Sequence, residues 1–383
     1  MESLFWIMAF LVIYHHILYP LILTKVSSGL NRQPKEPTSA NKDEPQNIDI
    51  LMPAYNEAEF IQSKLANLSC LDSTRRKLTI HIGLDGCTDS TFEVLETELS
   101  DPMYQDLDFR IYNFGQNRGK IAVLNDLMTH STSDIVLLTD TSALLPIDCL
   151  EQLDVCFADS KIGAVSLGYT FYDAASDGEA SYWQYQTRIK QAESHMNSVL
   201  GAHGAGYALR RELYTPLSTD VINDDFIIPM SIIRQGYRVL YCESHAAVEL
   251  EHASDNQNFN RRKRISKGNF QQLILCLDLL SPRYGYVAFN FFSGKALRSL
   301  MPIFLALLFV MSFVMGLNSE FYLLLFGIQS MAYCGAFVML ALNRPPKHKL
   351  LSIPYYIITG HLASLFGMLA YLHKDSGKPW QKV

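Results

Sequence analysis

Residues 134–140, DIVLLTD, decide the fold class, because this strongly apolar run of strand length ends at Asp140 and two hydroxyl residues follow it. Five further runs have a similar strand-like composition: 48–55 (IDILMPAY), 78–85 (LTIHIGLD), 109–114 (FRIYNF), 162–171 (IGAVSLGYTF) and 237–242 (YRVLYC). Segments of helical period separate these runs. The alternation predicts an α/β domain with a mainly parallel sheet, whose site lies beyond the carboxyl ends of the strands.

The composition of the whole chain predicts a mosaic of soluble and membrane segments. Of its 383 residues, 49% are hydrophobic and only 18% are charged. The net charge of −6 argues against nucleic acid as a partner, because a duplex binder needs a basic surface. The seven cysteines include no CxxC pair, so we expect neither a disulfide framework nor a zinc site, and a reducing compartment fits best.

The N-terminal segment has the properties of a signal anchor. Leu4 to Leu23 is uncharged and has about the ~20 residues that a helix needs to cross a bilayer. Lys25, Arg32 and Lys35 follow it, which places the next domain in the cytoplasm by the positive-inside rule.

The C-terminal part of the chain is apolar again. Candidate spans lie near 299–317, 321–342 and 353–372, and the basic loop NRPPKHK between the last two indicates the cytoplasmic side. Residues 281–298 suit an amphipathic helix at the membrane interface, or alternatively a helix packed on the soluble domain. The expected organisation is an anchor (1–25), a linker (26–47), an α/β domain (48–272), an interfacial segment (273–298), three spans (299–373) and a tail (374–383).

The ends of the first two strands carry residues suited to a nucleotide. Pro53 and Ala54 suit a turn, Tyr55 offers a flat face for a base, and Glu57 is a hydrogen-bond acceptor. A plain strand-to-helix turn explains these residues as well. Asp85 closes the second strand, where it suits either a contact with a uracil or ribose or a role in the turn.

Two later motifs suit phosphates and a metal. The sequence NRGK at 117–120 precedes a helix, so Lys120 belongs either to an anion site or to a solvated basic turn. Asp140, with Ser142 two residues later, could hold Mg²⁺ or Mn²⁺, since these ions also take oxygens from a substrate diphosphate. A simple turn is the alternative for Asp140.

Paired carboxylates and a basic run complete the set. Asp224 and Asp225 precede a helical run, and close like charges raise one pKa, as a general base near neutral pH requires. Helix capping is the other interpretation. Arg261, Arg262 and Arg264 suit either a leaving diphosphate or anionic lipid headgroups.

In their order and spacing these motifs resemble the family 2 glycosyltransferases, in particular the membrane-embedded branch that includes cellulose, chitin and hyaluronan synthases. The resemblance covers about residues 48–272 and implies a Rossmann-like GT-A fold with transmembrane helices at both ends. It implies that Asp140 begins the DxD metal motif and that Asp225 is the catalytic base of the (T)ED motif. The nucleoside site would use Pro53, Tyr55, Glu57, Asp85 and Lys120. His203, Gly204 and Gly206 would line the sugar and acceptor pocket, unless their glycine-rich stretch is only a tight turn.

The sequence departs from the pattern of this family at three places. Leu84 replaces the first of two paired aspartates, and Ser142 replaces the second aspartate of DxD. The sequence RRKRI at 261–265 stands where processive synthases carry QxxRW. These changes put processive synthesis in doubt and imply weaker metal binding, while the arginines remain available for a diphosphate.

The resemblance implies an inverting transfer from a nucleoside-diphosphate sugar, with UDP as the expected nucleotide, to a growing glycan or lipid-linked acceptor. Asp225 would deprotonate the acceptor, while Mg²⁺ or Mn²⁺ at Asp140, with Lys120, Arg262 and Arg264, would stabilise the departing diphosphate. Expected partners are membrane lipids and polysaccharide-export subunits, in the inner membrane. Transfer of a single sugar to a lipid-linked acceptor and a catalytically silent nucleotide-sugar-binding subunit are the alternatives.

Overall fold

The computed structural model describes residues 1–30, 46–172, 177–251, 255–342 and 349–373. The chain forms two compact units. One contains residues 1–23 and 254–375 and is helical, and the other, mainly residues 24–253, contains a β-sheet. Each unit is described by itself. We predicted that the α/β domain ends at residue 272. Helix α9 (Asp255–Leu275), which contains this position, groups with the helical unit, and the boundary stays a prediction.

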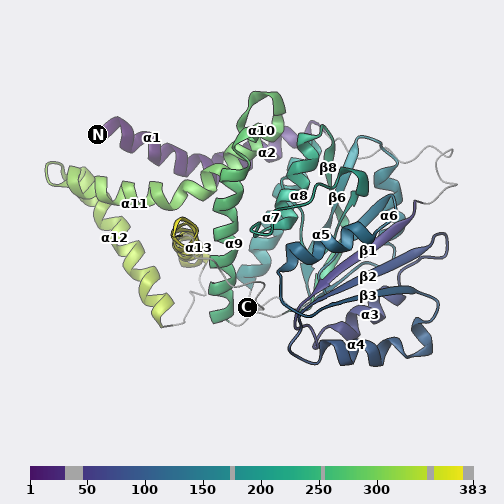
Figure 1. Ribbon diagram of the computed structural model, residues 1–383. Coiled ribbons are helices and arrows are strands. Elements are labelled where there is room, and N and C mark those ends of the chain that lie inside the picture. Colours follow the sequence, from purple (N-terminus) through teal and green to yellow (C-terminus); the bar gives the residue numbers. More distant parts are fainter. Residues whose placement is uncertain (31–45, 173–176, 252–254, 343–348, 374–383) are drawn as a thin grey trace. The chain divides into compact units, whose positions relative to one another are not determined.

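The sheet has eight strands in the described residues, in the order β3-β2-β1-β4-β7-β6-β8-β5. Figure 1 labels β1, β2, β3, β6 and β8. Their bounds are β1 Ile48–Ala54, β2 Leu78–Asp85, β3 Asp108–Phe114, β4 Ile135–Leu138, β5 Ala143–Leu144, β6 Ile162–Phe171, β7 Tyr207–Arg210 and β8 Arg238–Glu249. Strands β1 to β4 pair in parallel, as do β6 and β8, whereas β7 runs antiparallel between β4 and β6. The predicted α/β fold with a mainly parallel sheet is confirmed.

Helices cover both faces of the sheet. Alternate residues of a strand point to opposite faces. The side chains at positions 48, 50, 52 and 54 of β1 pack in one core with α3 and α6, whereas Gly83 of β2 faces Val123 and Leu127 of α5 on the other side. The helices of this unit are α3 Ile61–Ser69, α4 Thr91–Leu99, α5 Lys120–His130, α6 Cys149–Phe157, α7 Asp177–Met196 and α8 Asp224–Arg234.

The structure contains two strands that the sequence patterns did not predict, β5 and β7. Strand β5 has two residues and β7 has four, which is too short for a clear period of apolar residues. Strand β7 also directly follows the glycine-rich segment, for which we expected either a sugar and acceptor pocket or a tight turn and no strand. The six predicted strands correspond to β1, β2, β3, β4, β6 and β8.

Among the described residues, four helices are long and apolar enough to cross a membrane, at 2–28, 286–316, 320–341 and 354–372. They belong to the helical unit, apart from residues 24–28. Short π-helical turns join α1 (Glu2–Ile13) to α2 (Tyr19–Ser28), and α10 (Tyr286–Asn290) to α11 (Leu297–Gly316). The remaining helices are α12 (Glu320–Ala341) and α13 (Lys349–Leu372). The number of spans agrees with the prediction, but the second one begins at Tyr286, within the segment that we expected to lie at the interface.

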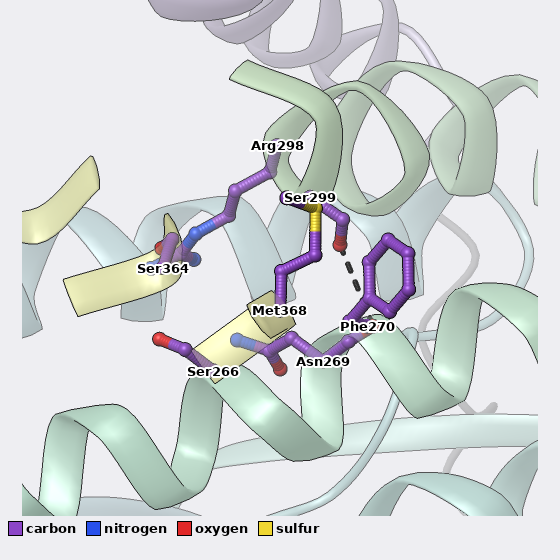
Figure 2. A pocket seen from close by; sticks show the side chains of 7 residues that line it. All are labelled: Ser266, Asn269, Phe270, Arg298, Ser299, Ser364 and Met368. Carbon is purple, nitrogen blue, oxygen red and sulfur yellow. Dashed lines mark hydrogen bonds between the residues drawn. The ribbon is translucent and has the colours of Figure 1, made fainter. Parts of the chain in front are cut away.

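Polar groups also occur within this helical unit. Figure 2 shows a small pocket lined by side chains of α9, α11 and α13, in which the Ser299 hydroxyl donates a hydrogen bond of 3.4 Å to the Asn269 carbonyl. The other lining residues are Ser266, Phe270, Arg298, Ser364 and Met368. Arg298 lies in the candidate span at 286–316 and Ser364 in that at 354–372, and such polar groups are unusual there because they are costly in membrane segments.

Candidate functional site

The loops after β1 and β2 are joined by side-chain hydrogen bonds. Asn56 adopts a left-handed backbone conformation with φ of 57°, and its Oδ1 accepts a hydrogen bond from the Thr88 N–H at 2.8 Å. The Glu57 N–H donates to the Thr91 hydroxyl at 2.8 Å. Tyr55 and Glu57, both expected at the nucleoside, therefore lie on a loop that its neighbour holds in place, while Pro53 is buried in β1 itself.

Asp85 organises the loop that leads to Lys120. Its carboxylate is fully buried and accepts hydrogen bonds from the backbone N–H groups of Arg118 (2.9 Å) and Gly119 (2.8 Å). Gly86 packs on the same loop, since a Cβ at this position would lie 2.5 Å from the Asn117 nitrogen. The contribution of Asp85 to the turn is thus visible in the structure, and its contact with a nucleoside stays a prediction.

Lys120 connects carboxylates from two separate motifs. Its ammonium lies 2.9 Å from Asp140 Oδ1, beyond the end of β4, and 3.4 Å from Asp224 Oδ1, in the first turn of α8. Burial disfavours the charged ammonium, but Asp140 and Asp224 more than offset this and raise the pKa of Lys120. Three motifs that are far apart in the sequence therefore meet at one point, and Lys120 is not part of a solvated turn.

Asp224 and Asp225 have different surroundings. The buried Asp224 accepts a 2.8 Å hydrogen bond from the hydroxyl of Tyr207, in addition to its contact with Lys120. Burial and the charge of Asp224 raise the pKa of Asp225 to about 6, against the opposing effects of Lys120 and Lys190. Asp225 is therefore the carboxylate of the pair that is better suited to accept a proton near neutral pH.

The glycine-rich segment packs against both carboxylate motifs. The Ala202 N–H donates to the Asp225 carbonyl at 2.7 Å, and the Gly206 N–H donates to the His203 carbonyl at 3.1 Å, which closes a tight turn. A Cβ at Gly204 would lie 2.8 Å from Asp140 Oδ2. The segment thus forms a turn, as one of the two interpretations expected, and it also borders Asp140.

His203 projects from this turn into a group of aromatic rings. Its imidazole stacks on Tyr169 with ring centres 5.0 Å apart, and the Tyr241 ring lies at 6.1 Å. Aromatic side chains commonly provide the flat surfaces on which ligands pack. The role of His203, Gly204 and Gly206 in a sugar and acceptor pocket stays a prediction.

Three buried residues that the sequence analysis did not identify support the site. Lys64 is fully buried in α3 and donates to the Thr139 hydroxyl (2.7 Å) and to the Ala143 carbonyl, on either side of Asp140. Burial lowers the pKa of Lys64 to about 7, although Asp140 acts in the opposite direction. Lys190 in α7 donates to the Gly201 carbonyl at 2.9 Å, and Tyr207 holds Asp224. The sequence did indicate that Lys64 is buried, because it lies on the same helix face as the apolar residues Ile61, Leu65 and Leu68.

The donor set around Asp140 fits a metal only together with a substrate. The described residues contain no group of three His, Cys, Asp or Glu side chains that could hold an ion alone. Asp140 provides a carboxylate, and Thr141, which follows it, has a buried hydroxyl with no hydrogen-bond partner among the described residues. Ser142 is also buried, with 9% of its surface exposed. Because Mg²⁺ commonly takes one or two carboxylates plus phosphate oxygens, a diphosphate would complete the site.

The three arginines expected at the diphosphate are not part of the sheet unit. Arg261, Arg262 and Arg264 belong to α9, which is part of the helical unit. Their roles in binding a diphosphate or lipid headgroups both stay predictions.

Comparison with protein families agrees with the motifs assembled here. Residues 49–215 match the model described as glycosyl transferase family 2, and residues 135–343, more than half of the chain, match that of glycosyl transferase family group 2. The chain belongs to glycosyltransferase family 2. The transferase is therefore an enzyme of the family that its motifs resemble.

Curated relatives of this transferase include two kinds of bacterial protein. Poly-β-1,6-N-acetyl-D-glucosamine synthase of Staphylococcus aureus is 24% identical over 247 residues, which cover 62% of the chain. An N-acetylglucosaminyltransferase of Azorhizobium caulinodans is 21% identical over 264 residues, covering 63% of the chain and 64% of the relative. The match spans only 56% of the length of the staphylococcal synthase.

Among solved structures, the transferase is similar to the mannosyltransferase PcManGT of Pyrobaculum calidifontis, in complex with GDP-mannose and Mn²⁺. The match has a TM-score of 0.71 at 21% identity and covers 96% of this chain and 99% of the other. It supports the GT-A fold. Separately, four helices among the described residues are long and apolar enough to cross a membrane.

Proposed function

We propose that the transferase moves a sugar, with inversion, from a nucleoside-diphosphate donor to an acceptor hydroxyl, and that Asp225 is the general base. The observation that carries this proposal is that Asp140 and Asp224 meet at the Lys120 ammonium, at 2.9 and 3.4 Å. The raised pKa of Asp225, which lies next to Asp224 in the first turn of α8, supports it. A carboxylate that titrates near neutral pH can accept the acceptor proton as the hydroxyl attacks the anomeric carbon. Asp224 contacts the Tyr207 hydroxyl and the Lys120 ammonium, and its different role would be to hold these groups in place beside Asp225.

The donor would bind across the ends of β1, β2 and β4. Tyr55 and Glu57 lie on the loop after β1, which suits the nucleoside, and Asp85 holds the backbone that leads to Lys120. UDP-N-acetylglucosamine is our first candidate donor, because both curated relatives are named for N-acetylglucosamine. The structural relative was solved with GDP-mannose, so GDP-sugars belong in the same test.

A divalent metal, Mg²⁺ or Mn²⁺, would be held by Asp140 and the donor phosphates, with the Ser142 and Thr141 hydroxyls nearby in the sequence. When bound, it would supply positive charge for the developing negative charge of the leaving diphosphate. Lys120 adds a second cation at the same point, and Arg262 and Arg264 of α9 are further candidates. The Mn²⁺ complex of the structural relative supports this assignment.

The acceptor is either a growing glycan or a lipid-linked sugar. The staphylococcal relative, which is named as a polymer synthase, favours polysaccharide synthesis. The pocket around Arg298 favours the second candidate, because a guanidinium and the hydroxyls of Ser266, Ser299 and Ser364 suit the phosphate of a lipid-linked acceptor (Figure 2). Product length separates a polymer synthase from a single-sugar transferase.

The proposed location is the inner membrane, with the sheet unit in the cytoplasm. The basic residues Lys25, Arg32 and Lys35 after the first span support this orientation. Polysaccharide-export subunits are candidate partners if the product is a polymer.

The test is release of nucleoside diphosphate by the purified full-length protein. It is incubated with UDP-N-acetylglucosamine, UDP-glucose or GDP-mannose, with Mn²⁺ or with chelator, and with candidate acceptors. We expect metal-dependent release from one donor, nearly abolished in Asp225→Asn while donor binding persists. Asp106→Asn, an exposed acid-to-amide change, is the matched control and should leave turnover unchanged. Substantial turnover by Asp225→Asn would refute the assignment, and donor binding without turnover in the unmodified protein would indicate a silent subunit.

A further inference from the structure

A second group of reactive side chains lies around Cys242 of β8. Its sulfur is 3.6 Å from His245 Nδ1 and 3.8 Å from the Ser244 hydroxyl. On the other side of the ring, His245 Nε2 lies 3.1 Å from a carboxylate oxygen of Asp148. A thiol, an imidazole and a carboxylate thus form a continuous chain, which is an arrangement that activates a thiol. These residues are separate from the carboxylates of the proposed active site.

An irregularity in β8 creates this group. The parallel pairing of β8 with β6 passes from Leu167–Cys242 to Gly168–Ala246, so residues 243–245 bulge out of the strand. In a regular strand Cys242 and His245 would point to opposite faces, but the bulge turns the imidazole toward the sulfur. The bulge packs tightly on Gly168, where a Cβ would lie 2.9 Å from the Glu243 carbonyl oxygen.

A second cysteine lies next to the first. Cys156 of α6 is fully buried, in the same core cluster as Cys242. Interaction with the Cys156 thiol, the Ser244 hydroxyl and His245 lowers the pKa of Cys242, although burial acts in the opposite direction. Interaction with Cys242, together with burial, raises the pKa of Cys156. The two sulfurs are therefore unlike, and Cys242 is the one that loses its proton more easily.

The imidazole contact distinguishes Cys242 from Cys149 and Cys70 of the same unit. Cys242 is buried, with 6% of its surface exposed, and it lies two residues before Ser244, which is exposed. Cys149 is fully buried, and burial raises the pKa of its thiol to about 12. Cys70 is exposed, and no histidine among the described residues forms a hydrogen bond with its sulfur. A buried structural cysteine is usually inert, whereas a thiolate with a neighbouring thiol is susceptible to oxidation.

We propose that Cys242 and Cys156 form a site of reversible oxidation by hydrogen peroxide. The Cys242 thiolate attacks one peroxide oxygen, the O–O bond breaks, and the other oxygen leaves as hydroxide, which His245 protonates to water. Cys242 is then a sulfenic acid. The Cys156 sulfur attacks the sulfenic sulfur, the S–O bond breaks, and the Cys156 proton leaves with the hydroxyl group as a second water. Two thiols are oxidised to one disulfide while one peroxide is reduced to two waters.

The experiment treats the full-length protein in detergent with increasing hydrogen peroxide, blocks free thiols with N-ethylmaleimide, and maps the products by peptide mass spectrometry. We expect a Cys156–Cys242 disulfide at a peroxide concentration about tenfold below that which modifies Cys70. Dithiothreitol should reverse it. In Cys156→Ser, dimedone should trap sulfenic acid at Cys242, and His245→Gln should slow oxidation about tenfold.

Cys149→Ser is the matched control, because it removes another buried thiol of α6 and should leave the disulfide unchanged. Since the disulfide is sought in the unmodified protein, a variant that fails to fold does not affect the main measurement. The proposal is overturned if Cys242 reacts no faster than Cys70, or if the peptides of Cys156 and Cys242 are never found linked.

Discussion

Replacing Gly204 with alanine tests whether the glycine-rich turn positions Asp140. The added Cβ would lie 2.8 Å from Asp140 Oδ2, well inside the ~3.5 Å at which such atoms ordinarily meet. Either the turn or the carboxylate must move by about 0.7 Å to restore an ordinary contact, and overpacking of this kind typically costs about 1–3 kcal/mol. If the carboxylate moves, a loss of about 1.4 kcal/mol in transition-state stabilisation lowers turnover about tenfold.

The assay is metal-dependent release of nucleoside diphosphate at several Mn²⁺ concentrations. We expect Gly204→Ala to lower turnover about tenfold and to raise the Mn²⁺ concentration needed for half-maximal rate. Gly115→Ala is the matched control, because its Cβ would meet no described atom within 4 Å. Equal activity of the two variants would refute the positioning role.

A double-mutant cycle separates the contact from general damage to the fold. In an Asp140→Ala background the oxygen that meets the new Cβ is gone, so Gly204→Ala should cost less thermal stability there than in the unmodified protein. The comparison uses the unfolding midpoints of the four proteins in one detergent. Equal losses in the two backgrounds would show that the added methyl group strains something other than Asp140.

Three further predictions follow from the site and the topology. Because protonated Asp225 cannot accept a proton, turnover should fall as the pH drops through about 6. Asp224→Asn removes a negative charge that raises the Asp225 pKa, so the acidic limb of the pH–rate profile should move to lower pH in this variant. An acidic limb that does not move would contradict this. Tyr207→Phe removes the hydroxyl that donates a hydrogen bond to the buried Asp224 and should lower the free energy of unfolding by about 1–3 kcal/mol. Denaturant unfolding in detergent measures this change, and a decrease below about 0.3 kcal/mol would contradict the prediction. A membrane-impermeant maleimide should label the exposed Cys70 in inside-out vesicles and not in intact cells, with Cys70→Ser as control; labelling in intact cells would place the sheet unit outside.

Patterns in the sequence were sufficient to predict the elements that position the site. Strands β1, β2 and β4 are apolar runs with clear ends, and Asp85 and Asp140 follow from the rule that parallel strands present their sites at their carboxyl ends. The acidic pair at 224–225 precedes a helix, as predicted. Local sequence carries this information because strands, helices and turns are specified by the spacing of apolar residues and by turn residues within a few positions.

Contacts between distant segments could not be predicted in this way. Lys64 bonds to residues 75 and 79 positions away, and Tyr207 reaches Asp224 from β7, a strand too short to show a period. The activation of Cys242 depends on a bulge, and bulges leave little trace in the composition of a strand. Such residues are recognised only when the chain is folded, because their significance depends on what lies opposite them.

The ammonium of Lys120 has a consequence for the order in which ligands enter. It contacts the carboxylates of both Asp140 and Asp224, so a metal ion bound at Asp140, as we propose, would compete with this resident cation for the same carboxylate oxygen. A donor that arrived with the metal would offer its phosphates to the displaced ammonium, so that each ligand would remove the obstacle to the other. Metal and donor affinities would then be linked reciprocally. When the site holds neither ligand, the single positive charge of Lys120 offsets one of the two carboxylate charges.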